Sequence, residues 1–164
     1  MDRLKRNIAD VLMADARTPY SDIAAMTGAT EEEVAATVME MERDNTILKY
    51  TTIVREGRLN DAESVTALIE VKVSPQREIG FDSIARRIYR FDEVESVFLM
   101  SGAYDLMVMI KAHSMREIAY FVAQRLSTID GVLSTATHFV LQKYKELGVV
   151  YDMPEEEGRL PVSP

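Results

Sequence analysis

Apolar and polar residues change their spacing near residue 55 of the chain. Before that point, apolar side chains recur every three or four residues, which is the spacing of one face of an α-helix. Leu4, Ile8 and Val11 place a first helix at residues 2–15, and a short second helix follows Pro19 at residues 21–26. The N-terminal part of the chain is therefore predicted to be helical.

A third helix is predicted to begin at Thr30. Glu33 stands three residues later, a spacing that forms a capping box in which each side chain binds the other residue's backbone N–H. Asn45 is suited to end this helix in the left-handed conformation. Its buried stripe is predicted to consist of Val34, Val38 and Met41. Two helices joined by a turn at Gly28 are typical of the helix-turn-helix motif.

The segment after these helices predicts a wing and then a linker. Residues 47–54 are rich in Ile, Tyr, Thr and Val, which favours a strand. Residues 55–64 are charged and polar and are interpreted as a linker. We therefore expect a first domain at residues 1–54, a second at residues 65–150, and a tail rich in Pro, Glu and Gly at residues 151–164.

The second domain is predicted to alternate strands and helices in the order βαββαβ. Apolar and polar residues alternate over residues 66–73, and further strands are expected at residues 94–100, 104–112 and 132–142. One helix should begin at Ser74-Pro75, and another at Ser114 with a capping box to Glu117. The buried stripes of these helices are predicted to be Phe81, Ile84, Ile88 and Phe91, and Ile118, Phe121, Val122, Leu126 and Ile129.

The two halves of this domain repeat each other. Arg77-Glu78-Ile79 recurs as Arg116-Glu117-Ile118, each after a strand and opening a predicted helix. A duplicated βαβ unit is the ferredoxin-like arrangement, in which both helices cover one face of the sheet. Residues 106–110 are continuously apolar, so the other face also needs a cover. A second copy of the sheet is the simplest cover, and we predict a dimer.

A polar break at residues 101–105 separates two apolar runs. Gly102 can adopt a positive φ there, so that two strands meet at the break. Backbone N–H groups in such a loop can bind a carboxylate, and Asp105 can bind an ammonium group. The alternative is a tight turn that Asp105 merely caps. Thr135 and Thr137 share one strand face and can hydrogen-bond a ligand, although Thr is also common in strands.

Composition narrows the classes of protein that fit. The chain has 164 residues, a net charge of −8 and no cysteine, which excludes disulfides and thiolate metal sites and fits a cytoplasmic location. No apolar run approaches the roughly 18 residues of a membrane span, and the N-terminus leads into no signal-peptide core. The negative charge is unfavourable for a protein that binds nucleic acid through its phosphates.

The order of elements resembles that of the Lrp/AsnC family of transcriptional regulators over about residues 1–150. Residues 101–105 are similar to the family's effector-loop motif of Gly, any residue, Tyr and Asp, and residues 135–137 resemble its last strand. The resemblance implies an α+β fold with an N-terminal winged helix-turn-helix and a C-terminal ferredoxin-like ligand-binding (RAM) domain. It also implies dimers, often octameric rings, that sense an amino acid or related molecule at a subunit interface. The candidate ligand-binding residues are Met100, Ser101, Gly102, Ala103, Tyr104, Asp105, Thr135 and Thr137.

The helix-turn-helix departs from the family pattern in its charge. Basic residues usually follow the first apolar position of the third helix in the family, whereas here the helix begins with three glutamates, and Arg43 is the only basic residue from Thr30 to Asp44. The first 60 residues carry 8 basic and 11 acidic side chains, a net charge of −3. Carboxylates at this helix end repel DNA, although a Glu can accept from cytosine. The candidate DNA-contacting residues are Ser21, Thr30, Glu32, Glu33, Ala36, Thr37, Lys49 and Arg55.

No catalytic motif is found in the sequence. His113 and His138 have no identifiable partners, and no phosphate loop, Ser/His/Asp arrangement or zinc pattern occurs. No enzyme activity, metal or cofactor is therefore predicted. Three hypotheses stand: a ligand-responsive DNA-binding regulator, an oligomeric effector-binding module with weak or lost DNA binding, and an enzyme similar to tetrapyrrole decarboxylases.

Overall fold

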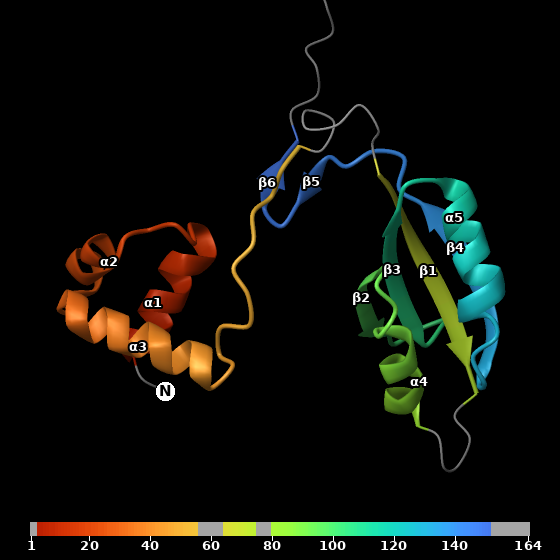
Figure 1. Cartoon of the computed structure of the whole chain (residues 1–164), viewed down its shortest axis with the longest axis horizontal. Coiled ribbons are helices and arrows are strands. Elements are labelled where there is room, and N and C mark those ends of the chain that lie inside the picture. Colours follow the sequence, from red (N-terminus) through yellow and green to blue (C-terminus); the bar gives the residue numbers. More distant parts are fainter. Residues whose placement is uncertain (1–2, 56–63, 75–79, 152–164) are drawn as a thin grey trace, which may run out of the picture. The chain divides into compact units, whose positions relative to one another are not determined.

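The computed structural model describes residues 3–55, 64–74 and 80–151 of the chain. The chain divides into two compact units, Met1–Val54 and Arg55–Pro164, and each is described by itself (Figure 1). The predicted linker and tail lie almost wholly outside the described residues. Within the described ranges, no helix is long and apolar enough to cross a membrane.

Three helices form the N-terminal unit: α1 (Arg3–Ala14), α2 (Tyr20–Thr27) and α3 (Glu31–Arg43). Their core consists of fully or almost fully buried side chains, and the predicted stripe of α3 is confirmed within it. These residues are Ile8, Ile23, Ala24, Val34, Val38 and Met41. Gly28 ends α2 at a φ of 73°, and Asn45 follows α3 at a φ of 60°, as predicted.

The predicted wing strand is wrong. Residues 47–54 form no strand, because nothing within the described part of this unit pairs with their backbone. Ile47 packs against the helical core, but Leu48 is 84% exposed. The Tyr50 hydroxyl donates a hydrogen bond of 2.9 Å to Glu42 on α3. The segment is thus attached to α3 by side chains, and β-forming residues alone did not make a strand.

The C-terminal unit is built on a four-stranded antiparallel sheet in the order β2-β3-β1-β4 (Figure 1). Its strands are β1 (Val65–Val73), β2 (Val94–Leu99), β3 (Leu106–Ala112) and β4 (Val132–Phe139). The predicted alternation in β1 is confirmed, since its inward side chains are at most 5% exposed. The inward set of β1 is Ala67, Ile69, Val71 and Val73. The order of elements and of strands confirms the ferredoxin-like prediction.

Both helices pack on one face of this sheet. Ile84 and Ile88 of α4 (Phe81–Ile88) join Ile118 and Phe121 of α5 (Met115–Phe121) in a single core with β1 and β3. A π-helical turn, η2 (Val122–Leu126), continues α5. The stripes predicted for these helices are therefore buried or packed against the core.

Two helix starts differ from the predictions. Gly80 has an extended backbone and precedes α4, so the helix begins at Phe81 rather than at Ser74-Pro75; residues 75–79 lie outside the described residues. Ser114 accepts from the Glu117 N–H at 3.2 Å, but the Glu117 carboxylate accepts from the N–H of His113, at 3.0 Å. The second capping box is therefore only half formed.

A short hairpin follows the sheet and was not predicted. It joins β5 (Lys145–Glu146) to β6 (Val149–Val150) through Leu147 and Gly148, whose φ values are 46° and 86°. Glu146 accepts hydrogen bonds from Lys143 at 3.0 Å and from the Tyr151 hydroxyl at 2.9 Å. The ammonium group of Lys143 is the main cause of a lowered pKa at Glu146.

Candidate functional site

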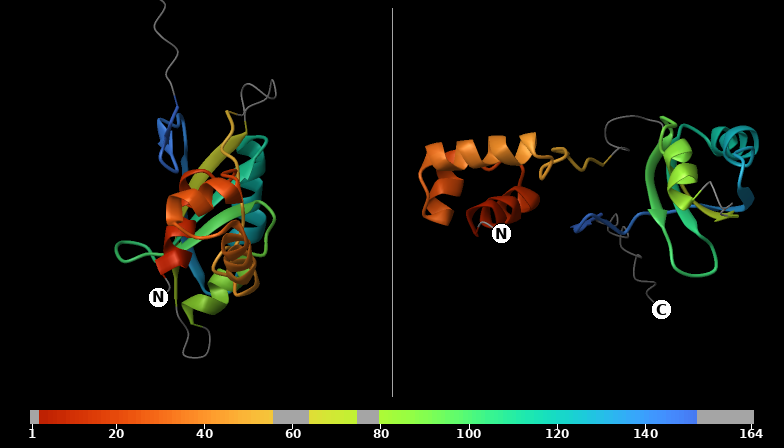
Figure 2. Two further views of the ribbon diagram at one scale, coloured as in Figure 1. Left: turned by 90° about the vertical axis from the view of Figure 1, so that its left-hand side faces the viewer. Right: turned by 90° about the horizontal axis from the view of Figure 1, so that it is seen from below.

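The connection between β2 and β3 contains the predicted effector loop. Figure 2 shows this connection, in green, projecting on the side of the sheet away from α4 and α5. Ser101, Gly102 and Ala103 are exposed, and Gly102 adopts a φ of 147°. The Met100 N–H donates to the Asp105 carbonyl at 2.8 Å and so closes the loop. Residues 101–103 are thus accessible to a ligand.

Asp105 attaches the end of this loop to β1. Its N–H donates to the Val71 carbonyl at 3.1 Å, and its Oδ2 accepts from the Val73 N–H at 2.8 Å. Asp105 therefore caps a backbone N–H group, as the alternative interpretation of the sequence predicted, but this group belongs to the neighbouring strand β1. A carboxylate has about four lone-pair sites, so the group keeps acceptor capacity for a ligand.

Thr135 and Thr137 lie on the helix-covered face of the sheet. They pair with Val71 and Ile69 of β1, both fully buried, and directly paired antiparallel residues point to the same face. The two threonine side chains are half-buried, and the Thr135 hydroxyl lies 3.5 Å from that of Ser127. Their predicted common face is confirmed, and it is the face that the helices cover.

The loop and the two threonines both lie near Val71 of β1, but within one subunit they do not line a common pocket. Asp105 contacts Val71 from the β3 side, and Thr135 pairs with Val71 from the β4 side. The exposed part of the loop projects away from the helices (Figure 2), whereas the strand register places Thr135 and Thr137 on the helix-covered face. A single subunit therefore does not enclose one pocket with both sets of residues.

Among the described residues of the C-terminal unit, no helix or strand covers the face of the sheet opposite α4 and α5. Register places Leu68, Met107, Met109 and Phe98 on it, and Phe98 is 53% exposed. Polar groups lie at its β4 side, where His138 Nε2 is 3.3 Å from Glu70 Oε1. The face is apolar in its middle.

In the helix-turn-helix, several predicted contact residues bind within their own helix. The Thr30 hydroxyl accepts from the Glu33 N–H at 3.2 Å, and the Thr30 N–H donates to Glu33 Oε2 at 2.8 Å, which confirms the capping box. The Thr30 N–H and the Thr30 hydroxyl, which also donates to Glu33 Oε2 at 3.1 Å, lower the pKa of the Glu33 carboxyl. The Thr37 hydroxyl donates to the Glu33 carbonyl at 2.7 Å. Thr30, Glu33 and Thr37 thus stabilise α3.

The outward face of α3 carries a different set. Glu32, Ala36, Met39 and Arg43 are exposed at helical spacing, opposite the buried stripe. Glu40 and Asp44 form ion pairs with Lys5 of α1, at 2.8 Å and 3.5 Å, and the bond to Glu40 is the main cause of a raised Lys5 pKa. One carboxylate, two apolar side chains and one guanidinium are therefore the groups this face presents.

The other candidates for DNA contact are exposed but dispersed. Ser21 lies on α2, where its hydroxyl donates to Asp22 at 3.5 Å. Lys49 and Arg55 are exposed in the extended segment after α3. In the described part of the chain, no cluster of three or more His, Asp or Glu side chains is placed to hold a metal ion.

Four arginines were not among the site residues predicted from the sequence. Arg86, Arg87 and Arg90 of the α4 region and Arg125 of η2 line two adjoining hollows. The sequence does show that three of them can lie on one helix face, because Arg86 and Arg87 precede Arg90 by one helical turn. Their approach to Arg125 depends on tertiary packing.

Two family models match the chain. The AsnC-type helix-turn-helix domain matches residues 1–42, and the Lrp/AsnC ligand binding domain matches residues 66–150. The second match alone covers more than half of the chain.

Relatives and solved structures agree with these matches. The uncharacterised HTH-type transcriptional regulator YugG of Bacillus subtilis is 45% identical, over 96% of this chain and 95% of its own. AsnC of Escherichia coli has a TM-score of 0.68 and 25% identity, over 89% of this chain and 95% of its own. A Neisseria meningitidis regulator solved as a complex with L-methionine has a TM-score of 0.70 at 19% identity, over 94% and 96% of the two chains. The relatives are named as regulators and not as enzymes, so the enzyme hypothesis is set aside and the chain belongs to the Lrp/AsnC family of transcriptional regulators.

Proposed function

We propose that this regulator binds DNA through its helix-turn-helix and senses an amino acid at a site completed by two subunits. One subunit supplies residues 100–105, and another supplies Thr135 and Thr137. The ligand then shifts the assembly between states that place the DNA-binding units differently. We expect the protein to act in the cytoplasm, as a dimer or a larger ring.

One observation carries the two-subunit site: the accessible loop and the two threonines lie on different sides of the same sheet. Both the loop and the threonines lie at the Val71 end of β1, but they point in different directions. A single ligand can therefore contact both sets only if a second copy of the chain supplies one of them. The accessible N–H groups of the loop suit a carboxylate, and Asp105 suits an ammonium group. The Neisseria relative solved with L-methionine supports an amino acid as the ligand.

The uncovered sheet face supports the assembly. Leu68, Met107 and Met109 form an apolar centre, and Phe98 extends it to β2. Burying such a face against a second copy removes apolar surface from water, at about 25 cal/mol per Å². A dimer formed there leaves the helices outside, where further copies can approach Thr135 and Thr137.

The DNA-binding unit is suited to weak contacts repeated over several subunits. On the outward face of α3, Ala36 can contact a thymine methyl group and Glu32 can accept from cytosine. Lys49 and Arg55 add phosphate contacts from the segment that follows. Several such units on one assembly gain affinity through a high effective concentration.

The test is binding of the full chain to its own upstream DNA and to random duplex DNA, titrated with salt and with L-amino acids. We expect preference for the upstream DNA, a steep loss with salt, and a shift caused by at least one amino acid. Salt-independent or undetectable DNA binding by the assembled protein contradicts the proposal.

The acidic start of α3 favours a second candidate, an effector-binding module that acts through protein partners. Glu31, Glu32 and Glu33 occupy the helix end that approaches DNA in helix-turn-helix proteins. An amino-acid response without DNA binding, even at low salt, supports this candidate over the first.

A further inference from the structure

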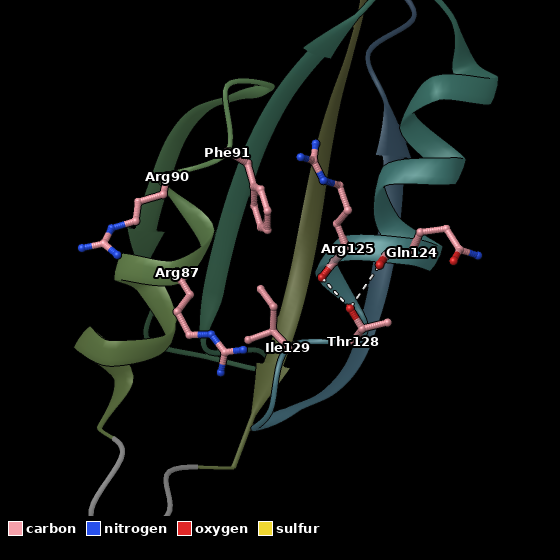
Figure 3. A pocket seen from close by; sticks show the side chains of 7 residues that line it. All are labelled: Arg87, Arg90, Phe91, Gln124, Arg125, Thr128 and Ile129. Carbon is pink, nitrogen blue, oxygen red and sulfur yellow. Dashed lines mark hydrogen bonds between the residues drawn. The ribbon is translucent and has the colours of Figure 1, made fainter.

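Two adjoining hollows lie on the helical side of the C-terminal unit, one between α4 and η2 and the other along α4. The first has a volume of about 420 Å³ and is lined by Arg87, Arg90, Phe91, Gln124, Arg125, Thr128 and Ile129. Figure 3 shows Arg87 reaching from α4 toward Ile129, and Arg125 beside the ring of Phe91. The second, of about 450 Å³, shares Arg87 and Arg90 and adds Arg86. Arg87 and Arg90 therefore line both hollows, and Arg86 and Arg125 line one each; in Figure 3 the Arg90 guanidinium points away from Arg125.

The acidic groups nearby leave part of this charge uncompensated. Arg125 is paired with Glu93, and Arg87 lies 3.6 Å from Asp130, whose carboxylate is 86% exposed and therefore only weakly bound. Asp82 is the acidic residue that lines the second hollow. Within the described ranges, Arg86 and Arg90 have no ion pair. Two guanidinium groups are thus available, and a third can exchange a weak partner for a better one.

The π-helical turn helps to build the hollow. η2 (Val122–Leu126) contributes Gln124 and Arg125 to its wall, and π-helical turns often occur at functional sites. The Arg125 guanidinium lies 4.8 Å from the centre of the Phe91 ring, which fixes its position by a cation–π contact. The Thr128 hydroxyl donates to the Arg125 carbonyl at 3.0 Å and closes the turn (Figure 3).

The chemistry of the lining suits a small organic anion. Guanidinium forks bind phosphate with two parallel hydrogen bonds, and a phosphate group can accept from two arginines at once. Phe91 and Ile129 give the hollow an apolar floor for a carbon skeleton, and its volume lies in the range of small-molecule sites. A DNA backbone needs no such floor.

We propose that the hollow between α4 and η2 is a second ligand site, which binds a phosphorylated small molecule through Arg87 and Arg90, with Arg86 and Arg125 at its edge. The site lies on the helix-covered side of the sheet, whereas the loop at residues 101–105 projects from the other side (Figure 2). Binding of a phosphorylated molecule in this hollow requires no amino acid at that loop.

The test is calorimetric titration of the full chain with pyrophosphate, ADP and citrate at about 50 mM salt, where charge contacts are little screened. We expect saturable binding of pyrophosphate and tighter binding of ADP, which adds an organic part. The double variant R87Q/R90Q should weaken both by about tenfold or more, because each lost charge-assisted bond is worth roughly that factor. The single variant R87Q is compared with the matched control R116Q, which removes one charge from an exposed arginine of α5 outside both hollows and should change binding less than about twofold.

Other outcomes overturn the proposal. Equal loss in R116Q and in the single variant R87Q means that net charge, and not the hollow, attracts the anion. Citrate binding as tight as pyrophosphate contradicts specificity for phosphate. Loss of DNA affinity in R87Q/R90Q, without any binding of pyrophosphate or ADP, assigns the arginines to the DNA backbone instead. Circular dichroism and an unchanged response to L-amino acids show that the variants are folded.

Discussion

The Asp105 carboxylate accepts a hydrogen bond from the Val73 N–H at 2.8 Å. This bond joins the loop at residues 101–105, the predicted effector loop, to the end of β1. The residue that the family resemblance assigns to a ligand therefore also stabilises the sheet. Its two roles can be separated, because the hydrogen bond needs an acceptor oxygen whereas an ammonium ligand needs the negative charge.

We predict that Asp105→Asn loses amino-acid binding but keeps the fold. The amide oxygen of the substituted side chain can still accept from Val73, so the free energy of unfolding should change by less than about 0.5 kcal/mol, whereas Asp105→Ala should lose about 1–2 kcal/mol. Loss of the charge should weaken binding of any L-amino acid to which the natural protein responds about tenfold or more. Denaturant unfolding and calorimetry measure the two effects.

Glu95→Gln is the control for Asp105, since it removes an exposed carboxylate from β2, away from the loop. If Asp105→Asn binds that amino acid as tightly as the control does, Asp105 serves the strand end alone.

The capping box at Thr30 should make the N-terminal unit sensitive to acid. Hydrogen bonds from Thr30 lower the pKa of Glu33 from an ordinary value of 4.5. A folded-state pKa below the unfolded one means that the stabilisation is present in full above about pH 4.5 and is lost as the pH falls through the folded pKa. We expect Glu33→Gln to destabilise the unit at pH 7, and the difference from the natural protein to shrink on acidification.

Glu32→Gln provides the matched control for this pH dependence. It removes a charge from the same helical turn, and so the same kind of interaction with the helix dipole, but it has no place in the capping box. Equal pH dependence for the two variants contradicts a specific role of the Thr30–Glu33 bonds. Unfolding monitored by circular dichroism between about pH 3 and pH 7 distinguishes these results.

Local sequence patterns predicted those elements whose buried side chains follow the period of one helix or one strand. The stripes Val34–Val38–Met41 and Ala67–Ile69–Val71 follow directly from helix and strand periods. The capping box at Thr30 formed because both partners belong to one helical turn. The same rule predicted Ser114, but there Glu117 binds the N–H of His113, one residue earlier.

Features that depend on distant partners were not predictable in this way. Residues 47–54 have strand-forming side chains, but a strand also needs a neighbouring backbone. The sequence identified Thr135 and Thr137 as a pair on one face, yet only the register with β1 shows that this is the helix-covered face. Likewise, Arg125 joins Arg87 and Arg90 only through the packing of η2 beside α4.

The uncovered sheet face predicts a variant that dissociates the protein. Met109 lies between Leu68 and Ser96 across the sheet, at the centre of that face. A carboxylate placed there should be buried without a partner on association, which costs several kcal/mol. We expect Met109→Glu to shift the protein to a smaller species in analytical ultracentrifugation.

Tyr120→Glu is a suitable comparison for this variant, because it introduces the same charge at a 67% exposed position on α5. Dissociation by Tyr120→Glu and not by Met109→Glu places the main contact on the helical side. Near-ultraviolet circular dichroism verifies that each variant keeps its tertiary packing.

The acidic start of α3 gives the sharpest test of how this unit meets DNA. Glu32 is exposed on the same helical face as Ala36 and Met39, opposite the core. If that face enters the groove, Glu32→Lys replaces a repulsive charge near the phosphates with an attractive one. DNA affinity at low salt should rise about tenfold or more, and the slope of log K against log salt should steepen by about 0.9.

Glu95→Lys makes the same charge change in the C-terminal unit and reports the effect of net charge alone. A gain that is equal in the two variants means that α3 does not face DNA. If the gain is confined to Glu32→Lys and selectivity for the upstream DNA falls, the natural glutamate lowers DNA affinity but raises sequence selectivity. This is the effect expected of a carboxylate that accepts a hydrogen bond from cytosine.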